Sequence, residues 1–333
     1  MVQLYRRNAR LGVLCFCLIT AVMGGTAQGQ GAWRPDKSVE IIIPTGAGGQ
    51  NDLNGRLIAK SLQELKLVST PVVVQNKTGG NQILAVVYLN QHPADPHYML
   101  YSAATIFTNQ IAGVAPQHYK DLTPLGLLLT EYTVISVKAD SPIKTMRDLI
   151  ERLKADPESI AFGVSARGGP NHLAVSQAMR SGGFDPKKLK LVVFKTNADS
   201  ITSMIGGHIH AVVSSVSSAA PQAQAGNTRI LAVAAPQRGS GILANVATMR
   251  EQGIEARGIS NWRIMFGPKG LTAAQAAYWE DALAKVATTA EWKQQLEGAG
   301  SDTRTMRGKE LVKWLDSEYA ATRAVMTDLG LAK

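Results

Sequence analysis

Apolar runs and helical patterns alternate along most of the chain. Residues 39–44 (VEIIIP) are rich in β-branched apolar residues, which is typical of a strand buried on both faces of a parallel sheet. Residues 51–65 follow with apolar positions at helical spacing, and Asn51 or Asp52 is the predicted N-cap. This order predicts an α/β fold whose sheets are mostly parallel and flanked by helices. Further predicted strands and helices lie at 71–76, 81–92, 97–103, 159–165, 172–183, 189–195, 199–207 and 209–215, and the C-terminal part from 272 onward is nearly all helical.

Two short strand-like segments, 132–138 and 228–235, are candidates for connections between two lobes. If both segments cross, the middle of the chain forms one lobe, and the N- and C-terminal parts together form the other. We therefore expect a first lobe of residues 33–136 plus 231–333, a second lobe of residues 137–230, and a ligand cleft between them.

The first 27 residues have the layout of a secretory signal peptide. Arg6, Arg7 and Arg10 precede an uncharged apolar run, and small residues at Gly25 and Ala27 predict cleavage after Ala27. The apolar run is too short for an ordinary membrane span, and an uncleaved N-terminal anchor is the alternative. We expect an exported, periplasmic protein.

Removal of the signal peptide changes the chemistry that the chain can offer. Cys15 and Cys17 both leave with it, so the mature protein has no disulfide and no thiolate for catalysis or metal binding. Three arginines and no acidic residue are lost, so the formal net charge falls from +10 to +7. The remaining positive charge favours an anionic ligand. Because it is not clustered in basic runs, we do not expect nucleic-acid binding. We expect a monomer.

The glycine-rich stretch TGAGGQND, residues 45–52, follows the first strand and precedes the first helix. It lacks the last glycine of a dinucleotide-binding fingerprint, because that position is Asn51, and no G-K-[ST] sequence follows. A turn without a ligand is the plain alternative. We favour an anion-binding loop, in which backbone N–H groups and the helix dipole converge on a carboxylate or phosphate.

A second loop, residues 162–173 (FGVSARGGPNHL), has the same place between a strand and a helix. Its Arg167 can hold a carboxylate through two hydrogen bonds, or it is a solvated surface arginine. Ligands of open α/β sheets bind beyond the carboxyl ends of the strands. Two facing lobes would therefore enclose a ligand between the two loops.

Six segments together resemble the extracytoplasmic solute receptors of tripartite tricarboxylate transporters, the Bug (Bordetella uptake gene) family. The first segment carries the family's pattern of a strand, P-F-x-x-G-G-x-x-D and a later arginine, with Pro44, Gly48, Gly49, Asp52 and Arg56 at the matching positions. The similarity runs from about residue 33 to the C-terminus. The other five segments are VVVQNKTGG (72–80), PADPHYML (93–100), FGVSARGGPNHL (162–173), VVFKTNADSITSMIGGHIHAVVSS (192–215) and ISNWRIMFGPKGL (259–271).

The resemblance implies a two-lobed periplasmic binding protein, type II-like, that captures a small organic acid and presents it to membrane permease subunits. It implies no cofactor and no catalysis. The family holds the carboxylate with backbone and small side chains of the two loops, partly through water. Phe194, Asn197 and Ser215 would be neighbours of the site. Carried onto this chain, the ligand-binding residues are Thr45, Gly46, Ala47, Gly48, Gly49, Asn51, Asn76, Ser102, Ala103, Thr105, Ser165, Ala166, Arg167, Gly168, Asn171, Lys195, Thr196, Ser214 and Trp262.

Several positions depart from the family's pattern. Thr45 stands where an aromatic residue is usual, Ala166 and Gly169 stand where glycine and serine are common, and Thr196 replaces a glycine. These departures bear on the identity of the acid and leave the class unchanged. Trp262 either lines the cleft or packs under a loop.

An exported α/β hydrolase or transferase is the alternative of another class, and a binding protein for an ABC-type transporter is a nearer one. SPIK at 141–144 and KTG at 77–79 carry signatures of penicillin-binding enzymes in the wrong order, and GVSAR at 163–167 departs from G-x-S-x-G in its last residue. His208 and His210 could share a metal, but no third ligand is apparent, so we expect no metal site.

Overall fold

The computed structural model describes residues 33–235, 237–239, 241–255, 261–297 and 305–333. The predicted signal peptide lies outside the described residues. Residues 33–333 form one compact unit. Among the described residues, no helix combines the length and the apolar character needed to cross a membrane.

The first sheet has five strands in the order β2-β1-β3-β10-β4. The β1–β2 and β1–β3 pairs are parallel, whereas β10 runs antiparallel to both β3 and β4. The prediction of a mostly parallel sheet is therefore wrong for half of the pairings, and the sheet is mixed. The strands are β1 (Val39–Ile43), β2 (Val72–Asn76), β3 (Tyr98–Ser102), β4 (Leu122–Glu131) and β10 (Asn261–Pro268).

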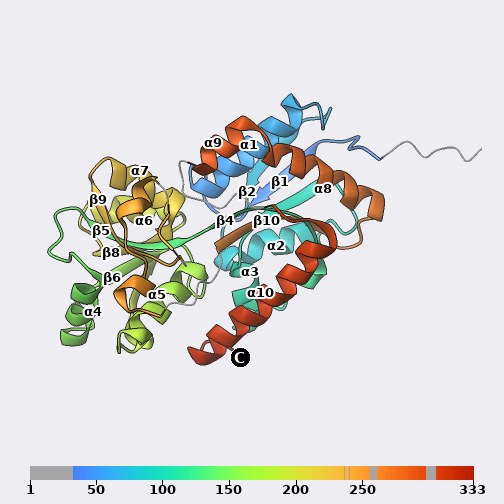
Figure 1. The fold of residues 1–333 in the computed structure, drawn as a ribbon. Helices are drawn as coiled ribbons and strands as arrows, with labels where there is room; N and C mark the ends of the chain where they lie inside the picture. The colour runs from blue at the N-terminus through green and yellow to red at the C-terminus, as the bar shows by residue number, and fades with distance from the viewer. Residues whose placement is uncertain (1–32, 236, 240, 256–260, 298–304) are drawn as a thin grey trace, which may run out of the picture. The chain divides into compact units, whose positions relative to one another are not determined.

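Helices cover both faces of the first sheet (Figure 1). Ile41 and Ile43 of β1 pack in a core with α1 and α8, and Ile42 packs on the opposite face with α2, α3 and α10. All three isoleucines are fully buried, as the continuous apolar run predicts for a strand covered on both faces. The helices are α1 (Gln50–Glu64), α2 (Ile83–Asn90), α3 (Thr105–Ile111), α8 (Ala273–Ala287), α9 (Ala290–Glu297) and α10 (Gly308–Asp328), with short 3₁₀ turns at Gly80–Gln82 (η1) and Tyr119–Asp121 (η2).

The second sheet repeats this plan with the order β7-β6-β8-β5-β9. Its β6–β7 and β6–β8 pairs are parallel, and β5 is antiparallel to both neighbours, so this sheet is mixed too. The strands are β5 (Thr133–Lys138), β6 (Ala161–Val164), β7 (Lys190–Val193), β8 (Ala211–Ser215) and β9 (Thr228–Val233). The helices are α4 (Met146–Ala155), α5 (Pro170–Ser181), α6 (Asn197–Ile205) and α7 (Val216–Gln224), with 3₁₀ turns at Pro186–Lys188 (η3), Gly241–Asn245 (η4) and Arg250–Gln252 (η5).

The two segments predicted to connect the lobes are instead strands β5 and β9 of the second sheet. Each is paired along its length, and the predicted boundaries at 137 and 230 fall inside them. The chain passes from one sheet to the other at Tyr132, between β4 and β5, and again between β9 and β10. The second sheet therefore spans residues 133–233.

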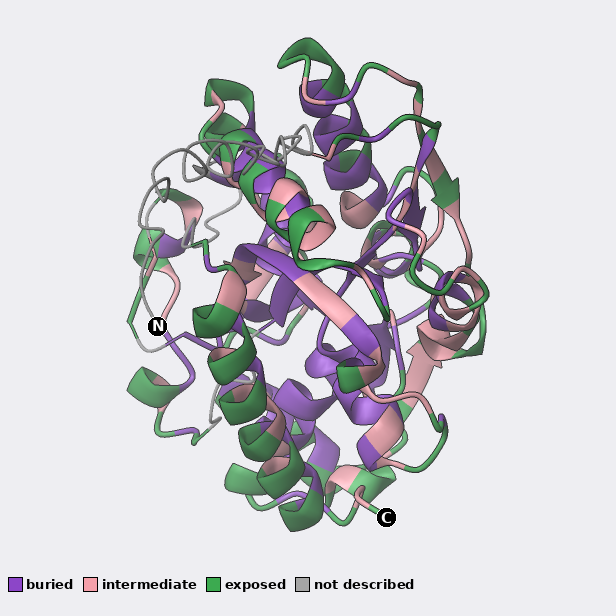
Figure 2. Ribbon diagram, turned by 90° about the vertical axis from the view of Figure 1, so that its right-hand side faces the viewer, coloured by how far each residue is buried: buried purple, intermediate pink, exposed green. Residues whose placement is uncertain are grey.

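Burial follows the sheets, as the purple strands and inward helix faces of Figure 2 show. Met146, Leu149 and Leu153 of α4 pack with β5 and β6 on one face of the second sheet. On the other face Ile201 of α6 and Val216 of α7 belong to two smaller cores. Both sheets are thus rigid supports for the loops at their strand ends.

Candidate ligand-binding site

A small polar cavity lies where loops from the two sheets meet. Its volume is about 40 Å³. Loops after β1, β3, β6, β7 and β8 contribute to it, as expected for a site at the carboxyl ends of strands. The lining residues are Thr45, Gly49, Gln50, Asn51, Gln82, Ala103, Thr105, Ser165, Pro170, Asn171, Thr196, Asn197, Ser215, Ser218, Asn261 and Arg263.

The first glycine loop is held in shape by Asp52. Its carboxylate accepts hydrogen bonds from the Gly48 N–H (3.0 Å) and from Arg56 Nε (2.9 Å). Burial alone would raise the pKa of Asp52, but these hydrogen bonds outweigh it and hold the pKa below its usual value. Helix α1 begins at Gln50 with Gly49 as its N-cap, so neither Asn51 nor Asp52 is the cap that we predicted.

The second glycine loop is held by a neutral histidine. His172 Nδ1 accepts a hydrogen bond from the Gly168 N–H (2.8 Å). Burial, assisted by the charge of Arg167, lowers the pKa of His172 to about 4. Beside it, Asn171 accepts a hydrogen bond from Thr133 Oγ1 (3.2 Å) and donates one to Asn197 Oδ1 (3.4 Å). Asn171 therefore lines the cavity in a fixed orientation.

The first glycine loop contacts the start of α6 directly. A Cβ atom placed on Gly49 would lie 2.9 Å from Cγ2 of Thr196, so only glycine permits this approach. A second contact crosses nearby, where Asn81 Nδ2 donates a hydrogen bond to the Arg167 carbonyl (3.0 Å).

A buried arginine reaches the cavity from β10. Arg263 donates hydrogen bonds to Asn51 Oδ1 (2.7 Å), Asn261 Oδ1 (2.7 Å) and Glu131 Oε2 (3.3 Å). The side chains of Arg263 and Glu131 are 8% and 2% exposed, so this is a buried ion pair. Ser217 of α7 donates a hydrogen bond to the other oxygen of Glu131. The cluster thus supplies a cation to the cavity and joins β4 to a helix of the second sheet.

Two buried polar atoms at the cavity lack a partner among the described residues. They are Thr45 Oγ1 and Gln82 Oε1. Gln82 has a φ of 74° and the preceding Asn81 a φ of 55°, which are unusual for residues other than glycine. Backbone strain of this kind clusters at ligand-binding sites. Both oxygens can receive hydrogen bonds from a ligand or from water.

The structure brings together most of the predicted site residues. Arg167, Gly168 and Lys195 line a wider groove that opens beside the cavity. Gly46, Ala47, Gly48 and Ala166 belong to the two loops without lining the cavity, and Asn76 supports the first loop by donating to the Thr45 carbonyl (2.9 Å). The predicted residues that line the cavity are Thr45, Gly49, Asn51, Ala103, Thr105, Ser165, Asn171 and Thr196.

Three predicted residues point away from the cavity. Trp262 is fully buried in the core, with its ring centroid 5.1 Å from that of Phe107. Ser102 and Ser214 are buried as well, while the residues that follow them, Ala103 and Ser215, line the cavity. Side chains alternate between the faces of a strand, so in β10 the choice of Trp262 in place of Arg263 selected the wrong face.

Outside the two predicted glycine loops, sequence reasoning missed four lining residues, Gln82, Ser218, Asn261 and Arg263. A signal for Arg263 was present, because it interrupts the otherwise apolar run WRIMF. A charge inside a buried strand requires a partner or a function.

The enzyme and metal alternatives gain no support. The two segments that carry signatures of penicillin-binding enzymes lie at different sheets. Ser141 is in the turn between β5 and α4, whereas residues 77–79 follow β2 in the other sheet. His210 Nδ1 accepts a hydrogen bond from the Ala161 N–H (3.1 Å). Within the described ranges, no group of three or more His, Cys, Asp or Glu side chains could hold a metal ion.

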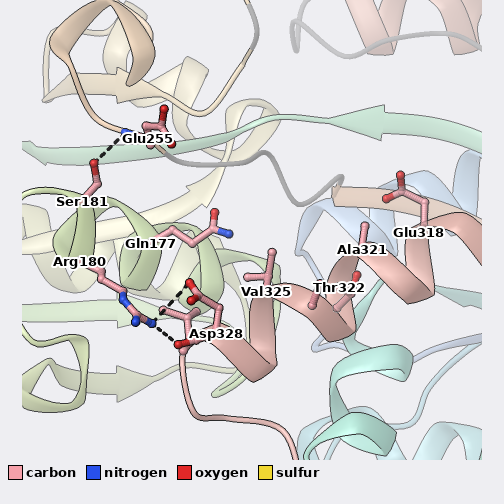
Figure 3. Close-up of a pocket in the computed structure, with 11 residues that line it drawn as sticks. Gln177, Arg180, Ser181, Glu255, Glu318, Ala321, Thr322, Val325 and Asp328 are labelled. Atoms are coloured by element: carbon pink, nitrogen blue, oxygen red, sulfur yellow. Dashed lines mark hydrogen bonds and ion pairs between the residues drawn. The ribbon is translucent and has the colours of Figure 1, made fainter.

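A separate groove lies between α5 and α10, away from the predicted site residues (Figure 3). Arg180 of α5 contacts Asp328 at the end of α10, and Ser181 accepts a hydrogen bond from the Glu255 N–H (2.8 Å). The C-terminal helix of the first sheet is thereby tied to a helix of the second.

Comparisons with known proteins agree with this architecture. A UPF0065 protein from the gbd 5′ region of Cupriavidus necator is 25% identical over 327 residues, which cover 98% of this chain and 97% of the relative. The structure of Rhodopseudomonas palustris Rpa4515 with adipate superposes with a TM-score of 0.81 at 23% identity, covering 90% of this chain and 99% of the other. MatC (Rpa3494) from the same organism, with bound malate, has a TM-score of 0.78 at 18% identity, covering 87% and 99%.

The family comparison identifies the chain. Residues 55–331 match the model of the tripartite tricarboxylate transporter family receptor. This match spans more than half of the sequence and includes every strand of the two sheets except β1. The resemblance seen in the six sequence segments is therefore confirmed, and this chain belongs to the tripartite tricarboxylate transporter family of receptors.

Proposed function

We propose that this receptor captures a small organic acid by its carboxylate in the cavity between the two glycine loops. The observation that carries the proposal is the convergence of Arg263 with the unpartnered oxygens of Thr45 and Gln82 in one cavity between the sheets. The malate and adipate in two related solved structures support a carboxylate as the ligand class.

The cavity offers a carboxylate three kinds of donor. The Arg263 guanidinium provides charge, and the hydroxyls of Thr105 and Ser165 are hydrogen-bond donors at the wall. Backbone N–H groups at the N-termini of α1 and α5 add the positive ends of two helix dipoles. Thr45 Oγ1 and Gln82 Oε1 suit water molecules that bridge to the carboxylate.

In this proposal, the receptor works by opening and closing two lobes. They move about the two places where the chain passes between the sheets, one next to Tyr132 and one between β9 and β10. The lobes are residues 33–132 with 261–333, and residues 133–233. The closed form would present one composite surface to membrane permease subunits. The protein acts in the periplasm as a monomer after cleavage following Ala27, and it releases its ligand chemically unchanged.

Thermal unfolding of residues 28–333 against a panel of acids tests this function. The panel contains mono-, di- and tricarboxylic acids and aromatic acids. An acid present at 100 times its dissociation constant should stabilise the protein by about 2.7 kcal/mol, which corresponds to a rise of a few degrees in Tm. Recovery of the acid intact distinguishes a receptor from a hydrolase or transferase.

A matched pair of variants locates the binding site. Ser165→Ala removes a hydroxyl at the cavity, whereas Ser136→Ala removes one that is buried in β5 away from it. We expect Ser165→Ala to weaken binding several-fold and Ser136→Ala to leave it unchanged. A panel without any shift, or equal effects of the two variants, would contradict capture in this cavity.

A further inference from the structure

The polar cavity continues into a much larger groove. The groove has a volume of about 850 Å³ and shares Thr45, Gln82 and Ser165 with the cavity. The two spaces are therefore neighbours along one path from the strand ends to solvent. A site for a single ligand can extend through both.

The inner cavity alone is too small for a whole organic acid. One water molecule needs roughly 10–15 Å³ of such space, so 40 Å³ corresponds to only a few waters. Small-molecule sites usually measure roughly 300–1,000 Å³, a range that includes the groove and excludes the cavity. A carboxylate held at Arg263 would leave the rest of its molecule in the groove.

The groove is apolar in character. Ile83, Phe194, Met326 and Leu331 contribute to its wall, and among the described residues no acidic side chain lines it. Val114 and Val193 also line the groove, at 57% and 52% exposure. These are high exposures for large aliphatic side chains, and an apolar ligand would remove them from water.

Two cations, Arg167 and Lys195, also line the groove. Both side chains are exposed, and within the described part of the chain neither forms an ion pair. They are suited to a second anionic group at the far end of a ligand.

We propose that the acid taken by this receptor carries an extended apolar body, an aliphatic chain of about six to eight carbons or an aromatic ring, that occupies the groove. This inference rests on the proposed function, because the carboxylate in the cavity fixes the end of the ligand. Where the far end of the body bears a second anion, Arg167 and Lys195 receive it. Short polar acids place little apolar surface in the groove and bind more weakly.

Calorimetric affinities for butanedioate, hexanedioate, octanedioate and octanoate test the proposal on the unaltered protein. Each added methylene that enters the groove should raise affinity roughly three- to four-fold. Octanedioate should then bind much more tightly than butanedioate. Equal or falling affinity with chain length would overturn the inference while leaving carboxylate capture intact. Absence of binding by all four acids and by the wider panel would instead overturn the proposed function.

Substitutions in the groove test whether the apolar body of the acid binds there. Val114→Asn with Val193→Asn makes the wall polar without adding charge and should weaken octanedioate binding by about tenfold, with little effect on butanedioate. Val312→Asn on α10 is the matched control, because Val312 is 46% exposed and lines neither space. Lys195→Gln should weaken octanedioate more than octanoate. An equal loss for all four acids in the double variant would overturn the assignment of the groove.

Discussion

Arg263 and Glu131 form a buried pair whose two members serve different parts of the molecule. Arg263 lines the cavity, and Glu131 ends β4 directly before the chain crosses to the second sheet. Desolvation makes each charge costly unless the other is present. Hydrogen bonds from Ser217 to Glu131, and from Arg263 to Asn51 and Asn261, satisfy much of the remaining hydrogen-bonding capacity. The pair is thus suited to hold an arginine in place for an anion.

Arg263→Gln should destabilise the fold by about 3–5 kcal/mol, because it leaves the Glu131 carboxylate buried without a cation. Urea unfolding at neutral pH measures the change. The double variant Glu131→Gln with Arg263→Gln should recover part of the stability while still failing to bind acids. A double variant that loses as much as the two single variants combined would show that the pair is not coupled.

His172 should make the stability depend on pH in a defined window. Its folded pKa of about 4 lies below the usual 6.5, so the unfolded chain binds a proton more readily between these values. The neutral His172 therefore contributes up to about 3 kcal/mol to the free energy of unfolding. This contribution is complete above pH 6.5 and is lost as the pH falls toward 4. His172→Gln should flatten the urea-unfolding profile over this window. A profile with the same slope in the variant would show that other groups cause the dependence.

At the scale of elements, the first glycine loop closely approaches the start of α6. Gly49→Ala would place a Cβ 2.9 Å from Cγ2 and 3.1 Å from Cβ of Thr196, so these two segments would have to separate by a few tenths of an ångström. We expect acid binding to weaken by about tenfold, a loss of about 1.4 kcal/mol, with only a small change in stability. Titration calorimetry with an acid from the thermal panel measures the loss.

A second substitution provides the control for this contact. Thr196→Ser removes Cγ2 but retains the hydroxyl that accepts a hydrogen bond from the Asp199 N–H (3.0 Å) at the start of α6. Affinity should therefore be partly restored in the double variant with Gly49→Ala. If Gly49→Ala weakens binding equally with threonine or serine at 196, steric contact is not the reason.

The sequence predicted well those elements whose local pattern is sufficient to define both their secondary structure and their burial. Strand β1 is a continuous apolar run covered on both faces, and its sheet buries it as expected. β5 and β9 were misread as connections, because an apolar segment looks the same whether it crosses between sheets or pairs within one. β10 pairs with β3 and β4 across more than a hundred residues of chain, a long-range antiparallel pairing that no local pattern reveals.

The site, like the fold, was predictable only where a local sequence pattern marks it. Loops after strands were found, since glycine, serine and asparagine cluster there in the sequence. Side chains within strands were not, because the choice between Trp262 and Arg263 depends on which face of β10 meets the core. Burial of an ion pair with Glu131, far away in sequence, could be seen only in three dimensions.

At the scale of the whole receptor, the proposed mechanism requires the contact between the first glycine loop and the start of α6 to open and close. Residues 28–333 contain no cysteine, so a pair introduced across this contact would have no competing thiol. A Cβ on Gly49 would lie 3.1 Å from the Cβ of Thr196, slightly closer than the roughly 3.5–4.5 Å found in disulfides. Gly49→Cys with Thr196→Cys should therefore form a disulfide after a small adjustment, since the second change also removes the obstructing Cγ2.

Oxidation of this double variant should trap the closed receptor. Acid bound before oxidation should remain through prolonged dialysis and be released on reduction, whereas acid added after oxidation should fail to bind. Each single variant treated with the same oxidant is the control for the individual substitutions, and mass spectrometry confirms the disulfide. Rapid exchange of the acid in the oxidised protein would mean that ligand enters without separation of the first glycine loop from the start of α6, and closure of two lobes would then not be the mechanism of capture.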